Sequence, residues 1–201
     1  MQEQFEAMYT SGEFREKWDY VHPSAELISF IATAKIPEGA QVLDVGCGAG
    51  REAVFLASQN YKAIGVDFSK EALKIAETRA REAEVTVDWR QGDVLDLPVE
   101  TGSIDFVNDR GCFHVISEDQ RGQYASELSR VLRPGGRILL RGCREHQSGL
   151  DWFTLVTPEA IDRHFSEDFT YGPVLALSII SDASREEGQG LKSNLVVLEK
   201  K

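Results

Sequence analysis

Several features that define other classes of protein are missing from this sequence. No run approaches the ~20 consecutive apolar residues of a membrane span, and the first residues lack the basic start and apolar stretch of a secretory signal. Basic side chains are outnumbered, with 22 Lys and Arg against 33 Asp and Glu, a net charge of −11. Because binding to phosphate backbones needs a basic face, we expect a cytoplasmic protein that binds neither membranes nor nucleic acid but a small or cationic partner.

Cysteine is scarce as well. The three cysteines, Cys47, Cys112 and Cys143, are an odd number without paired spacing, which indicates reduced thiols rather than a disulfide framework. There is no internal repeat and no low-complexity segment. The 201 residues, 42% of them hydrophobic, predict one domain with a sizeable core, and they carry no signal for an oligomeric state.

Strand-like and helix-like stretches alternate from Gln41 onward, as in a parallel sheet with helices on both faces. The last two strands have no helix between them and should pair antiparallel. Residues 1–38 are predicted to form a helical cap and residues 39–201 the core, with Ser69, Ser117 and Thr157 as helix N-caps. The pattern predicts strands at 41–46, 62–68, 85–93, 103–109, 133–142, 171–180 and 193–200, and helices at 51–60, 69–83, 117–132 and 157–165.

The stretch "VLDVGCGAGRE" ends an apolar run in a glycine-rich turn, where the backbone can approach a ligand. The dinucleotide fingerprint needs a glycine at the position of Arg51, and the phosphate loop needs G-K-[ST], so both nucleotide motifs are absent. Asp67 ends the second strand about 20 residues after Gly46, the reach at which a carboxylate binds ribose hydroxyls. Asp93 ends the third strand, where it is placed to accept a hydrogen bond from an adenine amino group. The order of these features predicts an adenosine-containing ligand.

Taken in order, "VLDVGCGAG", "GVDFS", "GDVLDLP" and "VLRPGGRILL" resemble the cofactor-binding motifs of class I S-adenosylmethionine-dependent methyltransferases, over roughly residues 41–141. The resemblance implies an EC 2.1.1 enzyme with S-adenosyl-L-methionine as methyl donor. It also implies an α/β, three-layer Rossmann-like fold with a seven-stranded sheet of order 3-2-1-4-5-7-6, the last strand antiparallel. Within the family, "DVGCGAGREAVFLA", "VDFS" and "DRGCFHVI" look loosely similar to the small thiopurine- and tellurite-resistance-type methyltransferases.

The resemblance also implies roles for particular residues. Asp67 would hold the ribose, Phe68 would lie against the adenine, and Asp93 with the Val94 backbone would read the adenine amino edge. The glycine turn would face the methionine portion, and the Asp109 backbone would lie near the methionine amino group. The implied donor-binding set is Asp44, Gly46, Cys47, Gly48, Gly50, Asp67, Phe68, Asp93, Val94 and Asp109.

The acceptor side carries no recognisable motif, so the acceptor and the atom methylated are left open. His114 is the candidate general base because "DRGCFHVI" begins at the carboxyl end of the fourth strand; a histidine that only satisfies its ring nitrogens is the competing interpretation. Three arginines are candidates for clamping an anionic group and three aromatic residues for walling a pocket, against surface and core roles. These candidates are Arg110, Arg141 and Arg144, and Trp18, Tyr20 and Trp152.

Two alternative functions remain open. One is a protein that binds S-adenosylmethionine without catalysis, which would keep the glycine turn and Asp67. The other is a metalloid or thiol methyltransferase. Cys47, Cys112 and Cys143 follow the first, fourth and fifth strands, which are neighbours in the expected sheet, and they would gather there as a soft-ligand site. Cysteine as a small apolar residue at crowded turns is the competing interpretation, and no resident metal is predicted.

Overall fold

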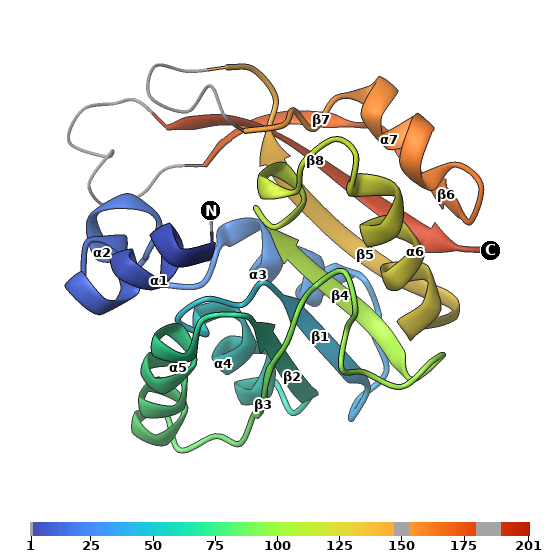
Figure 1. The fold of residues 1–201 in the computed structure, drawn as a ribbon. Helices are drawn as coiled ribbons and strands as arrows, with labels where there is room; N and C mark the ends of the chain where they lie inside the picture. The colour runs from blue at the N-terminus through green and yellow to red at the C-terminus, as the bar shows by residue number, and fades with distance from the viewer. Residues whose placement is uncertain (1, 147–152, 180–189) are drawn as a thin grey trace.

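The computed structural model describes residues 2–146, 153–179 and 190–201. In this part of the chain one eight-stranded sheet runs β3-β2-β1-β4-β5-β8-β6, with β7 also paired to β8 (Figure 1). Strands β3, β2, β1, β4 and β5 are mutually parallel, and β8 is antiparallel to β5, β6 and β7. The strands are β1 Gln41–Val45, β2 Lys62–Asp67, β3 Asp88–Gln91, β4 Ile104–Arg110, β5 Leu132–Cys143, β6 Phe169–Tyr171, β7 Leu175–Ile179 and β8 Leu191–Lys200.

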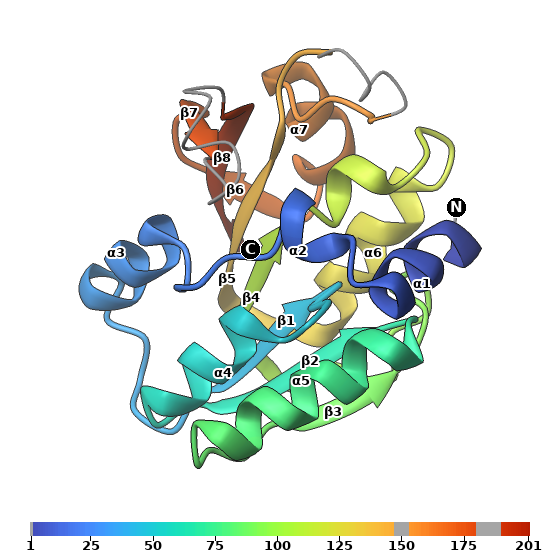
Figure 2. The same cartoon turned by 90° about the vertical axis from the view of Figure 1, so that its left-hand side faces the viewer.

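Helices cover both faces of this sheet (Figure 2). Consecutive strand residues point to opposite faces, so Val42 packs with α3, α4 and α5 whereas Leu43 packs with α6 and α7. The predicted α/β three-layer fold is therefore confirmed. The helices are α1 Gln2–Ser11, α2 Phe14–Lys17, α3 Ala25–Thr33, α4 Arg51–Ser58, α5 Lys70–Glu82, α6 Arg121–Val131 and α7 Pro158–Phe165, with a short 3-10 helix η1 at Phe113–Val115.

The predicted strand order is confirmed with one addition. Of the single strand predicted at 171–180, whose last residue lies outside the described residues, only Leu175–Ile179 forms β7. A short additional strand, β6 at Phe169–Tyr171, precedes it, and the two pair with different parts of β8. Gly172 and Pro173 separate the two strands, and proline has no N–H to donate to a strand ladder. The register restarts at Leu175, opposite Leu195.

Two of the three predicted helix caps are confirmed. Ser69 and Thr157 each accept a hydrogen bond from the backbone N–H of the third residue of their helix, at 3.0 and 3.2 Å. The prediction for Ser117 is wrong, because its hydroxyl donates to the Gln120 side chain at 2.8 Å and α6 begins only at Arg121.

The segment predicted as a helical cap, residues 1–38, lies in two different places on the sheet. Helices α1 and α2 lie beside the carboxyl ends of the strands, as expected (Figure 1). Helix α3 instead covers a sheet face, since Leu27 is fully buried there and the Phe30 ring stacks on Phe106 with centroids 5.0 Å apart. Within the described residues, no helix combines the length and apolar character that crossing a bilayer requires.

Candidate functional site

The carboxyl ends of β1, β2 and β4 lie side by side, because Val45 is opposite Val66 on one side and Asp109 on the other. The glycine turn follows β1 at this edge. Gly46, Gly48 and Gly50 have φ angles of +63°, +51° and +77°, a region that residues with a Cβ rarely adopt. The predicted turn is therefore present at the edge where open parallel sheets bind their ligands.

The turn is packed closely against other elements. A Cβ at Gly46 would lie 2.9 Å from the Cys112 Sγ, and one at Gly48 would collide with the Tyr9 hydroxyl. Gly46 itself is exposed, so its backbone faces open space. The three glycines thus form a tightly packed turn, in which Gly46 leaves a cradle of exposed backbone.

Asp67, at the end of β2, anchors this turn. One carboxylate oxygen accepts a hydrogen bond from the Gly48 N–H at 2.8 Å, and the other accepts one from the Ser69 N–H at 2.9 Å. Burial raises the pKa of this carboxyl group. Because each carboxylate oxygen has two lone pairs, acceptor capacity remains for the ribose hydroxyls predicted here.

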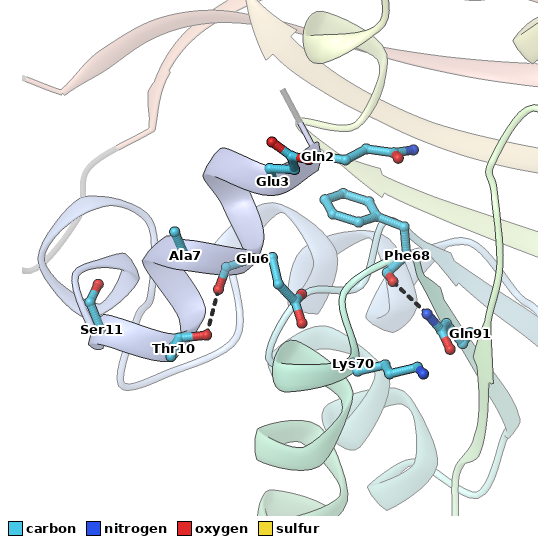
Figure 3. A pocket seen from close by; sticks show the side chains of 9 residues that line it. All are labelled: Gln2, Glu3, Glu6, Ala7, Thr10, Ser11, Phe68, Lys70 and Gln91. Carbon is cyan, nitrogen blue, oxygen red and sulfur yellow. Dashed lines mark hydrogen bonds between the residues drawn. The ribbon is translucent and has the colours of Figure 1, made fainter.

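A pocket of about 650 Å³ lies at the predicted adenine end (Figure 3). Phe68, half-buried, and Gln91 line it from the sheet side, and the Gln91 amide donates to the Phe68 carbonyl at 3.0 Å. Asp93 is exposed nearby in sequence; its Oδ1 accepts from the Leu95 N–H at 2.9 Å. Helix α1 forms the opposite wall, with Gln2, Glu3, Glu6, Ala7, Thr10 and Ser11.

Tyr9 on α1 is a site residue that sequence reasoning missed. Its hydroxyl reaches the glycine turn and accepts a hydrogen bond from the Trp18 indole N–H at 3.2 Å. Burial, reinforced by the Asp67 charge, raises the pKa of this phenol. Asp19, just beyond α2, is bound by the Arg79 guanidinium of α5. No local signal pointed to Tyr9, because its contact with Gly48 joins distant parts of the chain.

Asp44 lies beneath the turn, and both of its carboxylate oxygens accept hydrogen bonds. One oxygen accepts from the Asn108 amide at 2.7 Å, and the other accepts from the Ala53 N–H of α4 at 3.1 Å. Burial, and then the nearby Glu52 carboxylate, raise the pKa of Asp44 to about 7. Its side chain therefore holds β4 and α4 in place below the turn.

This raised pKa predicts a measurable pH dependence. The folded state binds a proton on Asp44 more tightly than the unfolded chain, so this group contributes stability that is complete below pH about 4 and lost as pH rises through about 7. The unfolding free energy of Asp44→Asn, relative to the unaltered protein, is expected to rise over that range, by about 1.4 kcal/mol per unit of pKa shift.

Chemical denaturation at a series of pH values measures this difference, with Asp119→Asn, at an exposed carboxylate, as the matched control. If the unfolding free energies of Asp44→Asn and Asp119→Asn change with pH in the same way from about 4 to about 7, the raised pKa assigned to Asp44 is wrong.

Asp109 lies one residue before the end of β4, with its carboxylate turned to the other face of the sheet. The carboxylate accepts hydrogen bonds from the Cys112 N–H at 2.7 Å, the Phe113 N–H at 3.1 Å and the Tyr124 hydroxyl at 2.8 Å. Burial raises its pKa to about 6. The Asp109 carboxylate thus fixes the start of η1. Only the Asp109 backbone remains for the contact with the methionine amino group that the resemblance implies.

His114 is buried between the ends of β4 and β5. Its Nδ1 accepts a hydrogen bond from the Cys143 N–H at 2.9 Å, and its ring stacks on Phe153 at 4.2 Å. The neutral ring therefore carries its proton on Nε2. Burial, and then the Arg121 guanidinium, lower the pKa of His114 to about 3. The geometry satisfies Nδ1 within the fold, which favours a structural interpretation of this histidine, and the general-base role stays a prediction.

The three cysteines are free thiols, but they do not form the soft-ligand site considered for a metalloid substrate. In the described residues, no group of three or more His, Cys, Asp and Glu side chains is placed to hold a metal ion. The Cys112 Sγ lies against Gly46, whereas the Cys143 Sγ donates to the Glu145 carbonyl at 2.9 Å. Burial raises the pKa of all three thiols, including Cys47. Cys47 and Cys112 lie close enough to interact electrostatically, whereas Cys143 is turned to Glu145. The metalloid alternative is thus not favoured, because the three thiols do not converge and protonated thiols make poor ligands.

Comparison with known proteins agrees with this geometry. A family model described as a methyltransferase domain matches residues 42–136, from β1 into β5. An uncharacterized methyltransferase of Schizosaccharomyces pombe is 35% identical over 104 residues, which span 52% of this chain and 72% of that protein. The chain belongs to the class I S-adenosylmethionine-dependent methyltransferases. S-adenosyl-L-methionine is accordingly the methyl donor of this methyltransferase, and the bare glycine cradle beside Asp67 fits such a ligand.

Two solved structures show the same fold as this methyltransferase. A protein studied for the conversion of a disulfide bond into a thioacetal group during echinomycin biosynthesis has a TM-score of 0.82 at 22% identity, over 100% of this chain and 93% of that chain. A TehB-like S-adenosylmethionine-dependent methyltransferase of Corynebacterium glutamicum has a TM-score of 0.68 at 21% identity, over 99% and 100%. The second is consistent with the loose resemblance to the tellurite-resistance type, although such identities show the fold alone.

Proposed function

We propose that this methyltransferase acts in the cytoplasm on a small-molecule acceptor and that residues 1–201 work as one domain. The net charge of −11 supports the proposal, since a nucleic-acid substrate would need a basic face. Relatives with small-molecule names support it too. They are the 2-phytyl-1,4-beta-naphthoquinone methyltransferase of Arabidopsis thaliana, 30% identical over 67% of this chain and 56% of that protein, and the 2-heptyl-1-hydroxyquinolin-4(1H)-one methyltransferase of Mycobacteroides abscessus, 27% identical over 70% and 63%.

In the proposed donor site, Asp67 accepts from the ribose hydroxyls and Phe68 lies against the adenine. Asp93 and the Val94 backbone bind the adenine amino edge. At the methionine end the backbone of the glycine turn and of Asp109 makes the contacts, and Asp44 positions the turn. This methionine-end group is Asp44, Gly46, Cys47, Gly48, Gly50 and Asp109.

The acceptor site is proposed between the N-terminal segment and the residues that follow β4 and β5. S-adenosylmethionine supplies a methyl group already activated by its positive sulfur, so the protein mainly has to align the acceptor atom with it and exclude water. Trp18 and Tyr20 of the N-terminal segment are the described aromatic residues placed to wall this site; Trp152 lies outside the described residues. A soft acceptor atom such as a thiol would need little help from a base.

The observation that carries the proposal is the buried Asp67, which ties the bare glycine turn to the start of α5 beside the pocket at Phe68. Calorimetry with S-adenosylhomocysteine tests donor binding, and a mass-spectrometry screen of thiol, amine, hydroxyl and carboxylate acceptors with labelled donor tests transfer. We expect saturable one-to-one binding and a labelled small-molecule product. Binding without any methylated product from the screen would support the non-catalytic alternative instead.

A further inference from the structure

Arg110 is a cation whose two terminal nitrogens have no partner in the described part of the chain. It ends β4, one residue beyond Asp109, and its side chain is 16% exposed. The guanidinium carbon lies 3.7 Å from the centroid of the Tyr20 ring, and Nε is 3.4 Å from a Glu52 carboxylate oxygen. Among the described residues, Nη1 and Nη2 make no hydrogen bond or ion pair, and neither is sealed in the interior. The guanidinium is therefore held by Tyr20 and Glu52, and its two terminal nitrogens remain available to a ligand.

A second arginine reinforces the positive charge at this place. Arg141 of β5 is directly opposite Arg110 in the sheet register and is fully buried. One of its terminal nitrogens donates to the Ser24 hydroxyl at 2.5 Å and the other to the Asn108 side-chain oxygen, while its buried Nε has no partner. Two guanidinium groups thus meet at the carboxyl edge of neighbouring strands.

Several carboxylates lie around this pair. The Glu52 carboxylate, which pairs with Arg110, also accepts from the Ser24 N–H at 3.2 and 3.3 Å. Asp44 belongs to the same buried network, but its pKa of about 7 leaves it partly protonated near neutral pH. Glu26 and Asp109 also act electrostatically on Arg141, so nearby carboxylates offset the pair, and the part left able to bind an anion is the pair of terminal nitrogens of Arg110.

We propose that Arg110 binds a carboxylate of the methyl acceptor through Nη1 and Nη2, with Tyr20 and Glu52 holding its guanidinium in place. This rests on the proposed function and names a substrate class for it: small acids. The planar fork of arginine matches a carboxylate with two parallel hydrogen bonds. The acceptor is favoured over the donor's own carboxylate because the Arg110 side chain lies on the Asn108 face, under residues 20–24, which belong to the proposed acceptor wall.

The test compares two probes of nearly the same shape, an anion with two acceptor oxygens and a neutral amide with one. Benzoate and benzamide are titrated by calorimetry into the complex of the full chain with S-adenosylhomocysteine. Benzoate is expected to bind at least about 10-fold tighter than benzamide, because a charge-assisted pair of hydrogen bonds exceeds a neutral contact by that factor or more. Arg110→Gln should abolish the preference, and Arg110→Lys, which keeps the charge without the fork, should retain only part of it.

Arg133→Gln is the matched control, since Arg133 is an exposed arginine that pairs with Asp105 at the other end of the sheet. It should leave the benzoate preference unchanged. Equal binding of benzoate and benzamide by the unaltered protein, or the same loss in both variants, would overturn the proposal. If Arg110→Gln does not fold, the Arg110→Lys comparison decides.

A third ligand distinguishes the carboxylate of the acceptor from the carboxylate of the donor. If Arg110→Gln weakens S-adenosylhomocysteine binding but not 5′-methylthioadenosine, which lacks the amino-acid part, Arg110 holds the donor's carboxylate and the acceptor assignment fails. If the unaltered protein binds no S-adenosylhomocysteine at all, the proposed function itself fails, which is a distinct result.

Discussion

Asp67→Asn is expected to lower the affinity for S-adenosylhomocysteine by about 100-fold, which corresponds to the loss of one or two hydrogen bonds to a charged group. Both carboxylate oxygens accept from backbone N–H groups, of Gly48 and Ser69. An asparagine keeps one acceptor oxygen and turns an amide donor toward the other N–H, so the glycine turn loses an anchor. The proposed ribose contacts lose their negative charge at the same time. Calorimetry with purified protein measures the change.

The Ser69→Ala variant distinguishes a loss of donor contacts from a general loosening at the start of α5. The Ser69 hydroxyl caps α5, and its removal should reduce stability by about 1 kcal/mol. We expect the Ser69 variant to bind the donor product with nearly unchanged affinity. An Asp67→Asn protein that binds S-adenosylhomocysteine as the unaltered protein does would remove the basis of the donor site.

Gly50→Ala is expected to reduce the free energy of unfolding by about 2–5 kcal/mol, the sum of a positive-φ penalty and overpacking. Gly50 has a φ of +77° at the start of α4. A Cβ there would lie 2.5 Å from the Trp89 ring and 2.6 Å from the Ala76 Cβ, and 3.1 Å from the Ala76 backbone. Relief requires the turn, α4 and α5 to shift apart, because the Ala76 backbone cannot rotate away. Denaturant titration followed by Trp fluorescence and circular dichroism measures the loss.

Gly102→Ala is the matched control for the backbone strain alone. Gly102 has a φ of +65°, but no atom lies within 4 Å of a Cβ built there. Its replacement should cost only about 1–2 kcal/mol. Equal losses at Gly50 and Gly102 would mean that the close packing of the turn against α5 contributes nothing.

Local chemistry explains why much of the fold was predictable. The positions of β1, β2, β4 and α5 follow from apolar strands and a helical stripe, which depend on residues close in sequence. The caps at Ser69 and Thr157 were predictable because each bonds within its own helix. At Ser117 an alternative local bond, to the Gln120 side chain, competed with capping, and no sequence rule decides between such neighbours.

The candidate site was predictable only where its residues belong to ordered motifs. The glycine turn and Asp67 follow consecutive strands of a parallel sheet, so the strand order alone brings them to one edge. The hydrogen bond that fixes the His114 ring comes from Cys143 on another strand, and nothing near His114 in the sequence indicates it. The same holds for the Tyr9 hydroxyl against Gly48.

The sequence by itself determined the order of strands and helices, the glycine turn and the acidic residues that follow it, because these depend on short-range periodicity and backbone conformation. Only the tertiary structure decided that α3 covers a sheet face, that the three cysteines do not converge on one site among the described residues, and that Arg110 meets Arg141 with its terminal nitrogens open. Each of these depends on which distant segments pack together and on how much water the packing removes. Burial then sets which charges are paired and which side chains remain able to bind a ligand.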